Sequence, residues 1–264
     1  MDIPLSLLKH CRQIKSAAHR LLSRLGLVRD VSAHYVRIDG GAALSESARL
    51  RGAWQSELLP ARQRELVDRQ LLSYRDGVAV EVFDVLVDAL RALPENPAGK
   101  TLLEIGCSSG FYSEVLEIAG IGVRYSGCDY STPFIELAQK IYPAMRFSVE
   151  DATSLRQADG EFDIVLSGCC LLHIPEYGKA VLETARVCTG YAIFHRTPVV
   201  LDQPDVYYRK QAYGVETVEI HFNEQQFLGL LEDSGLRLIA TYTLSESIRE
   251  GKREATRTYV CQKK

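Results

Sequence analysis

After Lys100, short apolar runs alternate with helical patterns of apolar residues. Apolar runs that end in glycine or polar residues predict strands, whereas apolar residues spaced three and four apart between these runs predict helices. Regular alternation of this kind is typical of parallel strands with crossover helices. The expected strands are 102–105, 123–128, 146–149, 162–167, 191–195, 236–244 and 256–262. The expected helices lie near 111–119, 133–141, 180–187 and 224–234, so the last two strands have no helix between them.

Helical patterns dominate the N-terminal part of the chain. Residues 1–30 predict a basic amphipathic helix, which either docks on the rest of the protein or contacts an anionic surface or partner. Residues 58–93 predict two further helices separated near Gly77. Prolines and a glycine in 94–100 end the second helix, because proline lacks the N–H that a helix needs. We therefore expect an N-terminal helical extension or lid over residues 1–95 and the main domain over residues 96–264.

Composition limits the class of protein. With 264 residues, of which 46% are hydrophobic, the chain can bury a large core, and its net charge of −3 provides no general attraction to nucleic acid. The 7 cysteines include no Cys-x-x-Cys pair, which argues against a zinc or disulfide framework and favours a reducing cytoplasm. No apolar segment is long enough for a membrane span. We expect a cytoplasmic protein without a nucleic-acid partner that can form a homodimer.

The run from Leu102 to Phe111 joins an apolar strand to a glycine-containing turn and the start of a helix. Glycine permits close approach of a ligand, and a helix N-terminus offers unpaired backbone N–H groups. Glu104 ends the strand, and its carboxylate repels a phosphate but attracts an amino group. The loop therefore suits a ligand with a cationic head better than a pyrophosphate.

Residues 104–110, Glu-Ile-Gly-Cys-Ser-Ser-Gly, resemble the first motif of the class I S-adenosylmethionine-dependent methyltransferases. Ser108 replaces the middle glycine of that motif, which costs strain if its φ is positive. A dinucleotide fingerprint fits worse, because Ser108 and Phe111 occupy two of its glycine positions. The resemblance implies a Rossmann-like α/β fold: a seven-stranded, mostly parallel sheet with helices on both faces and an antiparallel hairpin at its C-terminal edge.

Strand ends are the expected cofactor site, since ligands of open parallel sheets bind beyond the carboxyl ends of the strands. The carboxylate of Asp129, which ends the second strand, suits the ribose hydroxyls. By resemblance, Asp151 and Ala152 contact adenine, Glu104 binds the ammonium, and Gly168 and the neighbouring cysteines lie near the sulfonium. The expected cofactor residues are Glu104, Gly106, Cys107, Ser108, Gly110, Asp129, Tyr130, Asp151, Ala152, Ser167 and Gly168.

A histidine suits removal of a proton from a hydroxyl acceptor, because its ordinary pKa is about 6.5. His195, which ends the fifth strand, is the preferred base, and His173, which follows the fourth, is the second candidate. Between Pro198 and Phe222 an aromatic and basic cluster predicts a substrate lid, with a loop covering the sheet edge as the alternative, and Trp54 is expected on the other wall of the pocket. The expected substrate residues are Arg196, Tyr207, Tyr208, Tyr213 and His221.

These patterns together predict an S-adenosylmethionine-dependent methyltransferase that methylates a hydroxyl of a small molecule, such as a sugar, a phenol or a natural-product intermediate. No metal is expected, because the pair of aspartates plus asparagine expected of a metal-dependent enzyme is absent. The alternatives are an N-methyltransferase, a non-catalytic cofactor-binding or scaffold protein, and a nicotinamide-dependent reductase.

Overall fold

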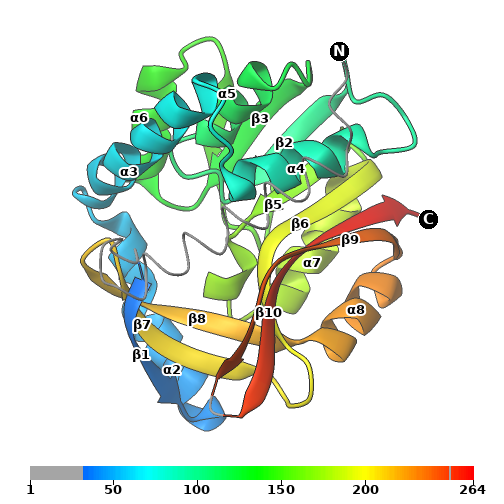
Figure 1. The fold of residues 1–264 in the computed structure, drawn as a ribbon. Coiled ribbons are helices and arrows are strands. Elements are labelled where there is room, and N and C mark those ends of the chain that lie inside the picture. The colour runs from blue at the N-terminus through cyan, green and yellow to red at the C-terminus, as the bar shows by residue number, and fades with distance from the viewer. Residues whose placement is uncertain (1–31, 250) are drawn as a thin grey trace.

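The computed structural model describes residues 32–249 and 251–264, so the expected basic helix at 1–30 lies outside the described residues. Its strands follow the order β1-β7-β8-β6-β5-β2-β3-β4, with β10 paired to β6 and β9 paired to β10 (Figure 1). The strands are β1 (Ser32–Ile38), β2 (Thr101–Ile105), β3 (Arg124–Asp129), β4 (Arg146–Val149), β5 (Phe162–Gly168), β6 (Cys188–Val200), β7 (Val206–Ala212), β8 (Val215–Asn223), β9 (Leu236–Arg249) and β10 (Lys252–Lys263). The helices are α2 (Gly40–Leu50), α3 (Leu59–Arg75), α4 (Glu81–Arg91), α5 (Phe111–Ile118), α6 (Thr132–Ile141), α7 (Tyr177–Val187) and α8 (Glu224–Asp233), with 3-10 turns η1 (Arg51–Gln55) and η2 (Leu171–His173).

The seven expected strands form one mostly parallel sheet. Strands β4, β3, β2, β5 and β6 pair in parallel, whereas β10 runs antiparallel to β6 and β9 antiparallel to β10. The alternation of side chains along each strand explains the two covered faces. Leu102 and Ile193 pack into the core cluster that includes α4 and α5, while Leu103 and Phe194 pack into the cluster that includes α7 and α8. The fold class expected from the sequence is therefore confirmed.

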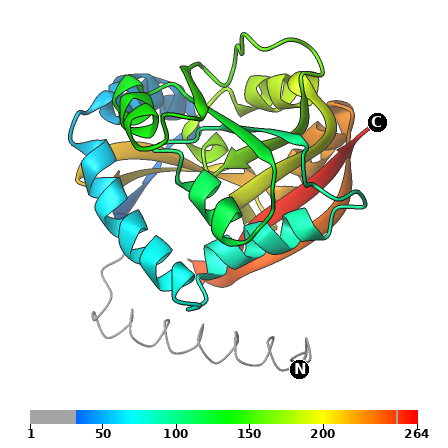
Figure 2. The same ribbon diagram turned by 90° about the horizontal axis from the view of Figure 1, so that it is seen from above.

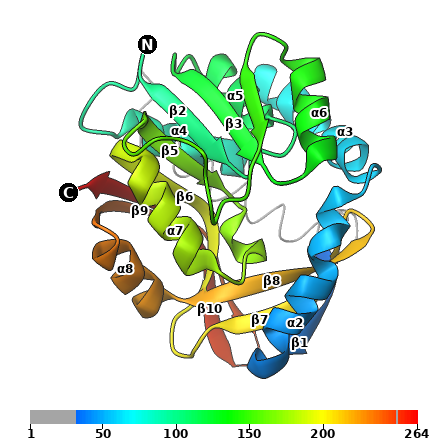
Figure 3. The ribbon, with the colours of Figure 1, turned by 180° about the vertical axis from the view of Figure 1, so that it is seen from behind.

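Figures 1 and 3 show the two faces from opposite sides, with α4 and α5 in front of the sheet in Figure 1 and α7 and α8 in front of it in Figure 3. Viewed from above, α3 and α4 follow one another along the same face (Figure 2). The two helices expected within 58–93 are present, and Gly77, with a φ of 77°, lies between them. None of the helices in the described ranges is long and apolar enough to cross a membrane.

An additional antiparallel sheet of β1, β7 and β8 was not expected, so the strand count differs from the predicted seven. The stretch predicted as a substrate lid is a hairpin, in which Tyr213 and Gly214 form a two-residue turn with φ values of 50° and 83°. Such turns require positive φ at both positions and match the twist of the flanking strands. The β-branched and aromatic residues of β7 and β8 were a strand signal, and the sequence interpretation gave it too little weight.

The hairpin joins the main sheet beside the end of β5. Strand β6 pairs with β5 as far as His195, and its last residues Val199 and Val200 pair with β8 instead. Since β10 occupies the other side of β6 at both places, β5 and β8 follow one another along the same side of β6. Two sheets therefore border the space between the end of β5 and the place where β8 pairs with β6. This space lies at the carboxyl ends of the parallel strands.

Candidate active site

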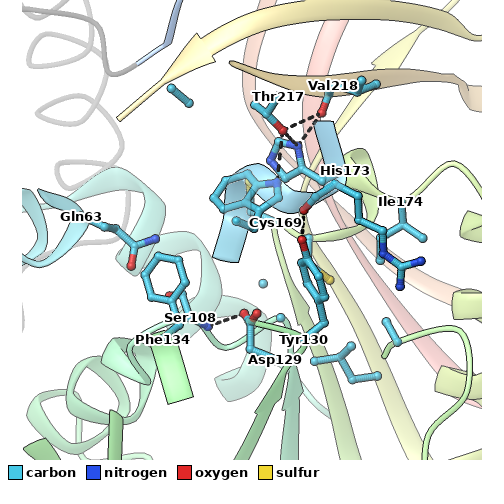
Figure 4. A pocket seen from close by; sticks show the side chains of 18 of the residues that line it. Gln63, Ser108, Asp129, Tyr130, Phe134, Cys169, His173, Ile174, Thr217 and Val218 are labelled. Carbon is cyan, nitrogen blue, oxygen red and sulfur yellow. Dashed lines mark hydrogen bonds between the residues drawn. The ribbon is translucent and has the colours of Figure 1, made fainter. Parts of the chain in front are cut away.

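A cavity of about 460 Å³ opens at these strand ends. Its walls come from the ends of β2, β3 and β5, from Arg196 within β6, from α2, η1 and α3, and from the β7–β8 hairpin. In Figure 4, Ser108 and Asp129 lie together in one part of this space, and His173 lies with Thr217 and Val218 in another. A volume in this range is typical of small-molecule sites.

The carboxylate of Asp129 is hydrogen-bonded to the glycine loop. Its Oδ2 accepts a hydrogen bond of 2.9 Å from the backbone N–H of Ser108, and its Oδ1 accepts one of 2.9 Å from that of Ser131. Burial raises the pKa of Asp129, while these backbone hydrogen bonds oppose the shift because they favour the charged form. Ser108 has a φ of 47°. The serine in the middle glycine position is therefore strained, as expected for a positive φ at that position.

Glu104 lies beneath the cavity wall. The hydroxyl of Tyr125 donates a hydrogen bond to its Oε2, whereas its buried Oε1 has no hydrogen-bond partner among the described residues. Oε1 also lies so close to Gly168, which lines the cavity, that a Cβ added to that glycine would be 2.5 Å from it. Burial and the charge of Asp129 hold the pKa of Glu104 well above its usual value, although the hydrogen bond from Tyr125 acts in the opposite direction. A buried, unpaired carboxylate oxygen at this wall fits a cationic ligand group.

The other expected cofactor residues divide into two groups. Cys107, Gly110 and Ser167 do not line the cavity, and Cys107 is buried in a small apolar cluster with Phe147. Gly110 precedes α5 with a φ of 74°, and a Cβ there would be 2.7 Å from the ring of Phe147. The hydroxyl of Ser167 lies 3.2 Å from Sγ of Cys170. The residues that the structure brings to the cavity are Gly106, Ser108, Asp129, Tyr130, Asp151, Ala152 and Gly168.

The 3-10 turn η1 closes over this part of the cavity. The guanidinium of Arg51 forms an ion pair with Asp151 and lies 5.5 Å from the ring centre of Tyr130. The side-chain N–H of Gln55 donates to the carbonyl of Tyr130 at 2.9 Å. Burial raises the pKa of Asp151, but hydrogen bonds from Thr153 and the charge of Arg51 outweigh it and lower the pKa overall. Three separate contacts therefore connect η1 to the loops that follow β3 and β4.

His173 lines the cavity and has a defined tautomer. Its Nδ1 lies 2.6 Å from the carbonyl oxygen of Val218, and since a carbonyl only accepts, Nδ1 carries the proton. Nε2 then bears the free lone pair. The ring centre of Trp54 lies 4.8 Å from that of His173, and the Trp54 indole N–H donates to Thr217 at 3.1 Å. Burial and the nearby charge of Lys210 lower the pKa of His173 to about 4, so the ring is neutral at pH 7.

His195, the preferred base in the sequence interpretation, is not placed on the cavity. Its side chain is 1% exposed, its Nδ1 lies 2.8 Å from the hydroxyl of Thr258, and its ring packs edge-on against Tyr112 at 5.5 Å. Burial lowers its pKa to about 3. The geometry therefore favours His173 over His195 as the histidine that can meet a ligand.

The five expected substrate residues also separate. Arg196 and Tyr213 line the cavity, whereas Tyr207, Tyr208 and His221 do not. The hydroxyl of Tyr208 donates to Glu254 at 3.1 Å, and Nε2 of His221 lies 2.8 Å from Oε1 of Glu219. Tyr207 and Tyr208 are neighbours on β7, and neither side chain reaches the cavity.

Strained backbone concentrates at the cavity. Of the five non-glycine residues with positive φ in the described ranges, four line it and His34 alone does not. Left-handed backbone of this kind costs of the order of 1–3 kcal/mol per residue and persists where the surroundings hold it, often at functional sites. The four are Ser108 (47°), Cys169 (68°), Arg196 (59°) and Tyr213 (50°).

Gln63 and Lys210 line the cavity although the sequence interpretation gave neither a place in the site. The side-chain carbonyl of Gln63, on α3, is buried without a hydrogen-bond partner among the described residues. A polar residue between Leu59 and Val67 on the apolar face of a helix was the signal for it. Trp54, by contrast, was expected on the pocket wall and lies there.

Comparison with known proteins recognises the part of the chain that carries the glycine loop and Asp129. Residues 103–194 match the family model described as a methyltransferase domain. A demethylmenaquinone methyltransferase of Renibacterium salmoninarum is 32% identical over 103 residues, which is 39% of this chain and 41% of the relative. A ubiquinone biosynthesis O-methyltransferase of Thiobacillus denitrificans is 32% identical over 97 residues, which is 34% of this chain and 40% of the relative. These matches span less than half of each relative.

Solved structures agree at the level of fold. The 1,6-didemethyltoxoflavin-N1-methyltransferase of Burkholderia thailandensis superimposes with a TM-score of 0.54 at 18% identity, over 88% of this chain and 98% of that chain. Residues 103–194 therefore match a methyltransferase domain, and the chain shares the Rossmann-like α/β fold of that structure. The resemblance stated from the motif at 104–110 is confirmed.

Proposed function

We propose that this protein is an S-adenosylmethionine-dependent methyltransferase that methylates a hydroxyl group of a small molecule. The observation that carries the proposal is one continuous cavity that joins the carboxylate-bearing glycine loop to a neutral histidine with a free Nε2. The named O-methyltransferase among the relatives supports a hydroxyl acceptor. Fold alone does not determine the reaction, so the argument rests on the residues of the cavity.

S-adenosylmethionine fits the residues at the glycine-loop side. Asp129 has lone pairs left after its two backbone hydrogen bonds and would accept from the ribose hydroxyls. The unpaired Oε1 of Glu104 would accept from the ammonium group, and Asp151 with Ala152 would contact the adenine. Gly106 leaves no room for a side chain, because a Cβ there would be 2.2 Å from Cβ of Cys170.

When bound, this cofactor supplies an electrophilic methyl group. The chain itself has to orient the acceptor, exclude water and remove a proton. Nε2 of His173 would accept the proton of the acceptor hydroxyl, and the Val218 carbonyl would stabilise the resulting cation by its hydrogen bond to Nδ1. Trp54 and Tyr213 would cover the acceptor, and α2, η1 and α3 of the N-terminal segment would serve as the lid over it.

Titration calorimetry with S-adenosylhomocysteine tests the cofactor half of the proposal. We expect micromolar binding by the full chain and a loss of at least about tenfold in Asp129→Asn, because the ribose loses a charged acceptor. Glu136→Gln is the matched control, since it removes an exposed carboxylate from α6 near the same loop. Equal binding by Asp129→Asn and Glu136→Gln would contradict the assignment.

A further inference from the structure

Arg196 reaches the cavity because β6 contains a bulge. The pairs Phe194–Tyr259 and Thr197–Arg257 leave His195 and Arg196 together opposite the single residue Thr258 of β10. In a regular strand, neighbouring side chains point to opposite faces. A bulge with a left-handed residue breaks this alternation, and the φ of 59° at Arg196 marks it.

Both side chains of the bulge consequently lie near Tyr112. The ring of His195 packs edge-on against the tyrosine ring, and the guanidinium of Arg196 lies beside the tyrosine hydroxyl. His195 remains buried in the core, while Arg196 lines the cavity. The strained backbone of the bulge therefore places the guanidinium of Arg196 on the cavity wall.

Arg196 has no carboxylate partner within the described part of the chain. The other two basic side chains on the cavity wall are neutralised, Arg51 by Asp151 and Lys210 by Glu219. The pKa of Arg196 is raised, because the thiol of Cys169 and the hydroxyl of Tyr112 lie close to the guanidinium. A cation largely removed from water and left unpaired costs free energy, and an anionic ligand group would offset this cost.

The position of Arg196 relative to the proposed base defines what the ligand must look like. Arg196 and His173 both line the cavity, and the charge of Arg196 contributes to the lowered pKa of His173. The carboxylates of Asp129 and Asp151 also line the cavity, on the side proposed for the cofactor. Trp54 provides a flat apolar surface against His173, and Tyr213 provides another close to Arg196.

We propose that the methyl acceptor is a hydroxy acid with a flat apolar body, whose carboxylate is bound by Arg196 while its hydroxyl meets His173. A single unpaired guanidinium matches the single charge and the bidentate geometry of a carboxylate better than the double charge of a phosphate ester. This inference rests on the proposed function, because it assigns the acceptor of the same reaction.

Binding of matched ligand pairs tests the inference without a known substrate. Ortho-, meta- and para-hydroxybenzoate and coumarate are each compared with the corresponding primary amide, and phenyl phosphate tests the other anion. Calorimetry is run with and without S-adenosylhomocysteine. For at least one pair, we expect the carboxylate to bind at least about tenfold more tightly than the amide and than phenyl phosphate.

The variants separate charge from folding. In Arg196→Gln the preference for carboxylate should fall to within about twofold, and Arg196→Lys should retain part of it, because the cation remains. Arg253→Gln, an exposed arginine paired with Asp202 away from the cavity, should behave as the unmodified protein. Melting temperatures show that each variant is folded.

Three outcomes would overturn the inference: no carboxylate binds, amides or phenyl phosphate bind as well as carboxylates, or Arg196→Gln keeps the preference. Loss of S-adenosylhomocysteine binding in Arg196→Gln, with carboxylate binding unchanged, would instead assign Arg196 to the cofactor and would equally overturn it. Failure of the unmodified protein to bind S-adenosylhomocysteine would contradict the proposed function, whereas the carboxylate preference is measured without the cofactor as well. The two failures are therefore distinguishable.

Discussion

Nδ1 of His173 lies 2.6 Å from the carbonyl oxygen of Val218, so the turn η2 that follows β5 is hydrogen-bonded to β8 of the additional sheet. The contact orients the imidazole and determines which nitrogen is free. It also depends on the hairpin that replaces the expected lid, because Val218 belongs to that hairpin.

Replacement of His173 by glutamine should lower kcat by about 10²-fold or more, because general-base catalysis contributes on this scale. Binding of S-adenosylhomocysteine should stay within about threefold, since His173 lies away from the glycine loop. With a pKa of about 4, His173 is neutral above that pH, so kcat at saturating cofactor should fall only as the pH drops toward about 4. Steady-state kinetics across this pH range give both readouts once an acceptor is in hand.

His34→Gln is the control for that experiment, because His34 is exposed on β1 and does not line the cavity. His195→Gln provides a second comparison. It should lower the melting temperature, since the ring is buried against Tyr112, without a comparable loss of kcat in the folded fraction. A large loss of kcat in His195→Gln together with full activity of His173→Gln would reverse the assignment of the base.

Glu104 should release a proton when a ligand with an ammonium group binds. Its pKa is well above the ordinary value in the ligand-free protein, because burial disfavours the charged form. A neighbouring cation favours the charged form and lowers the pKa, so between the two pKa values binding expels a proton and affinity rises with pH. Titration calorimetry with S-adenosylhomocysteine in buffers of different ionisation enthalpy measures the number of protons released.

The same measurement on Glu104→Gln should show no release from this site and weaker binding. Its free energy of unfolding should be unchanged or higher, because an amide has no charged form to bury. If the unmodified protein and Glu104→Gln release the same number of protons, Glu104 is not the group that titrates.

Gly168→Ala should destabilise the protein by about 1–3 kcal/mol, because the added Cβ would lie 2.5 Å from Oε1 of Glu104 and overpack the site. It should also weaken S-adenosylhomocysteine binding, since Gly168 lines the cavity. Gly229→Ala on α8 is the matched control. No atom lies within 4 Å of a Cβ at Gly229, so this change should stabilise the helix by up to about 1 kcal/mol. Urea unfolding of both variants checks the contrast in sign.

Much of the fold followed from local pattern. The apolar runs that became β2 to β6, β9 and β10 were visible because strand and helix periodicities differ within a few residues. The hairpin β7–β8 was missed because its turn residues, Tyr213 and Gly214, are an uncommon choice for a turn with two positive φ values. Strand β1 and helix α2 were not expected either, and both are held by contacts with distant segments.

For the candidate site, the sequence alone determined the part made of consecutive residues: the acidic strand end at Glu104, the glycine loop and the acidic end of β3 at Asp129. Strand, loop and helix there follow one another along the chain, so their chemistry can be read locally. Only the tertiary structure decided which histidine and which arginine face the cavity. His195 and Arg196 are neighbours, and the bulge that brings both side chains near Tyr112 exists because β6 pairs with β10, a strand formed far along the chain. Side-chain direction in a strand depends on register with its partner, and register is a property of the folded sheet.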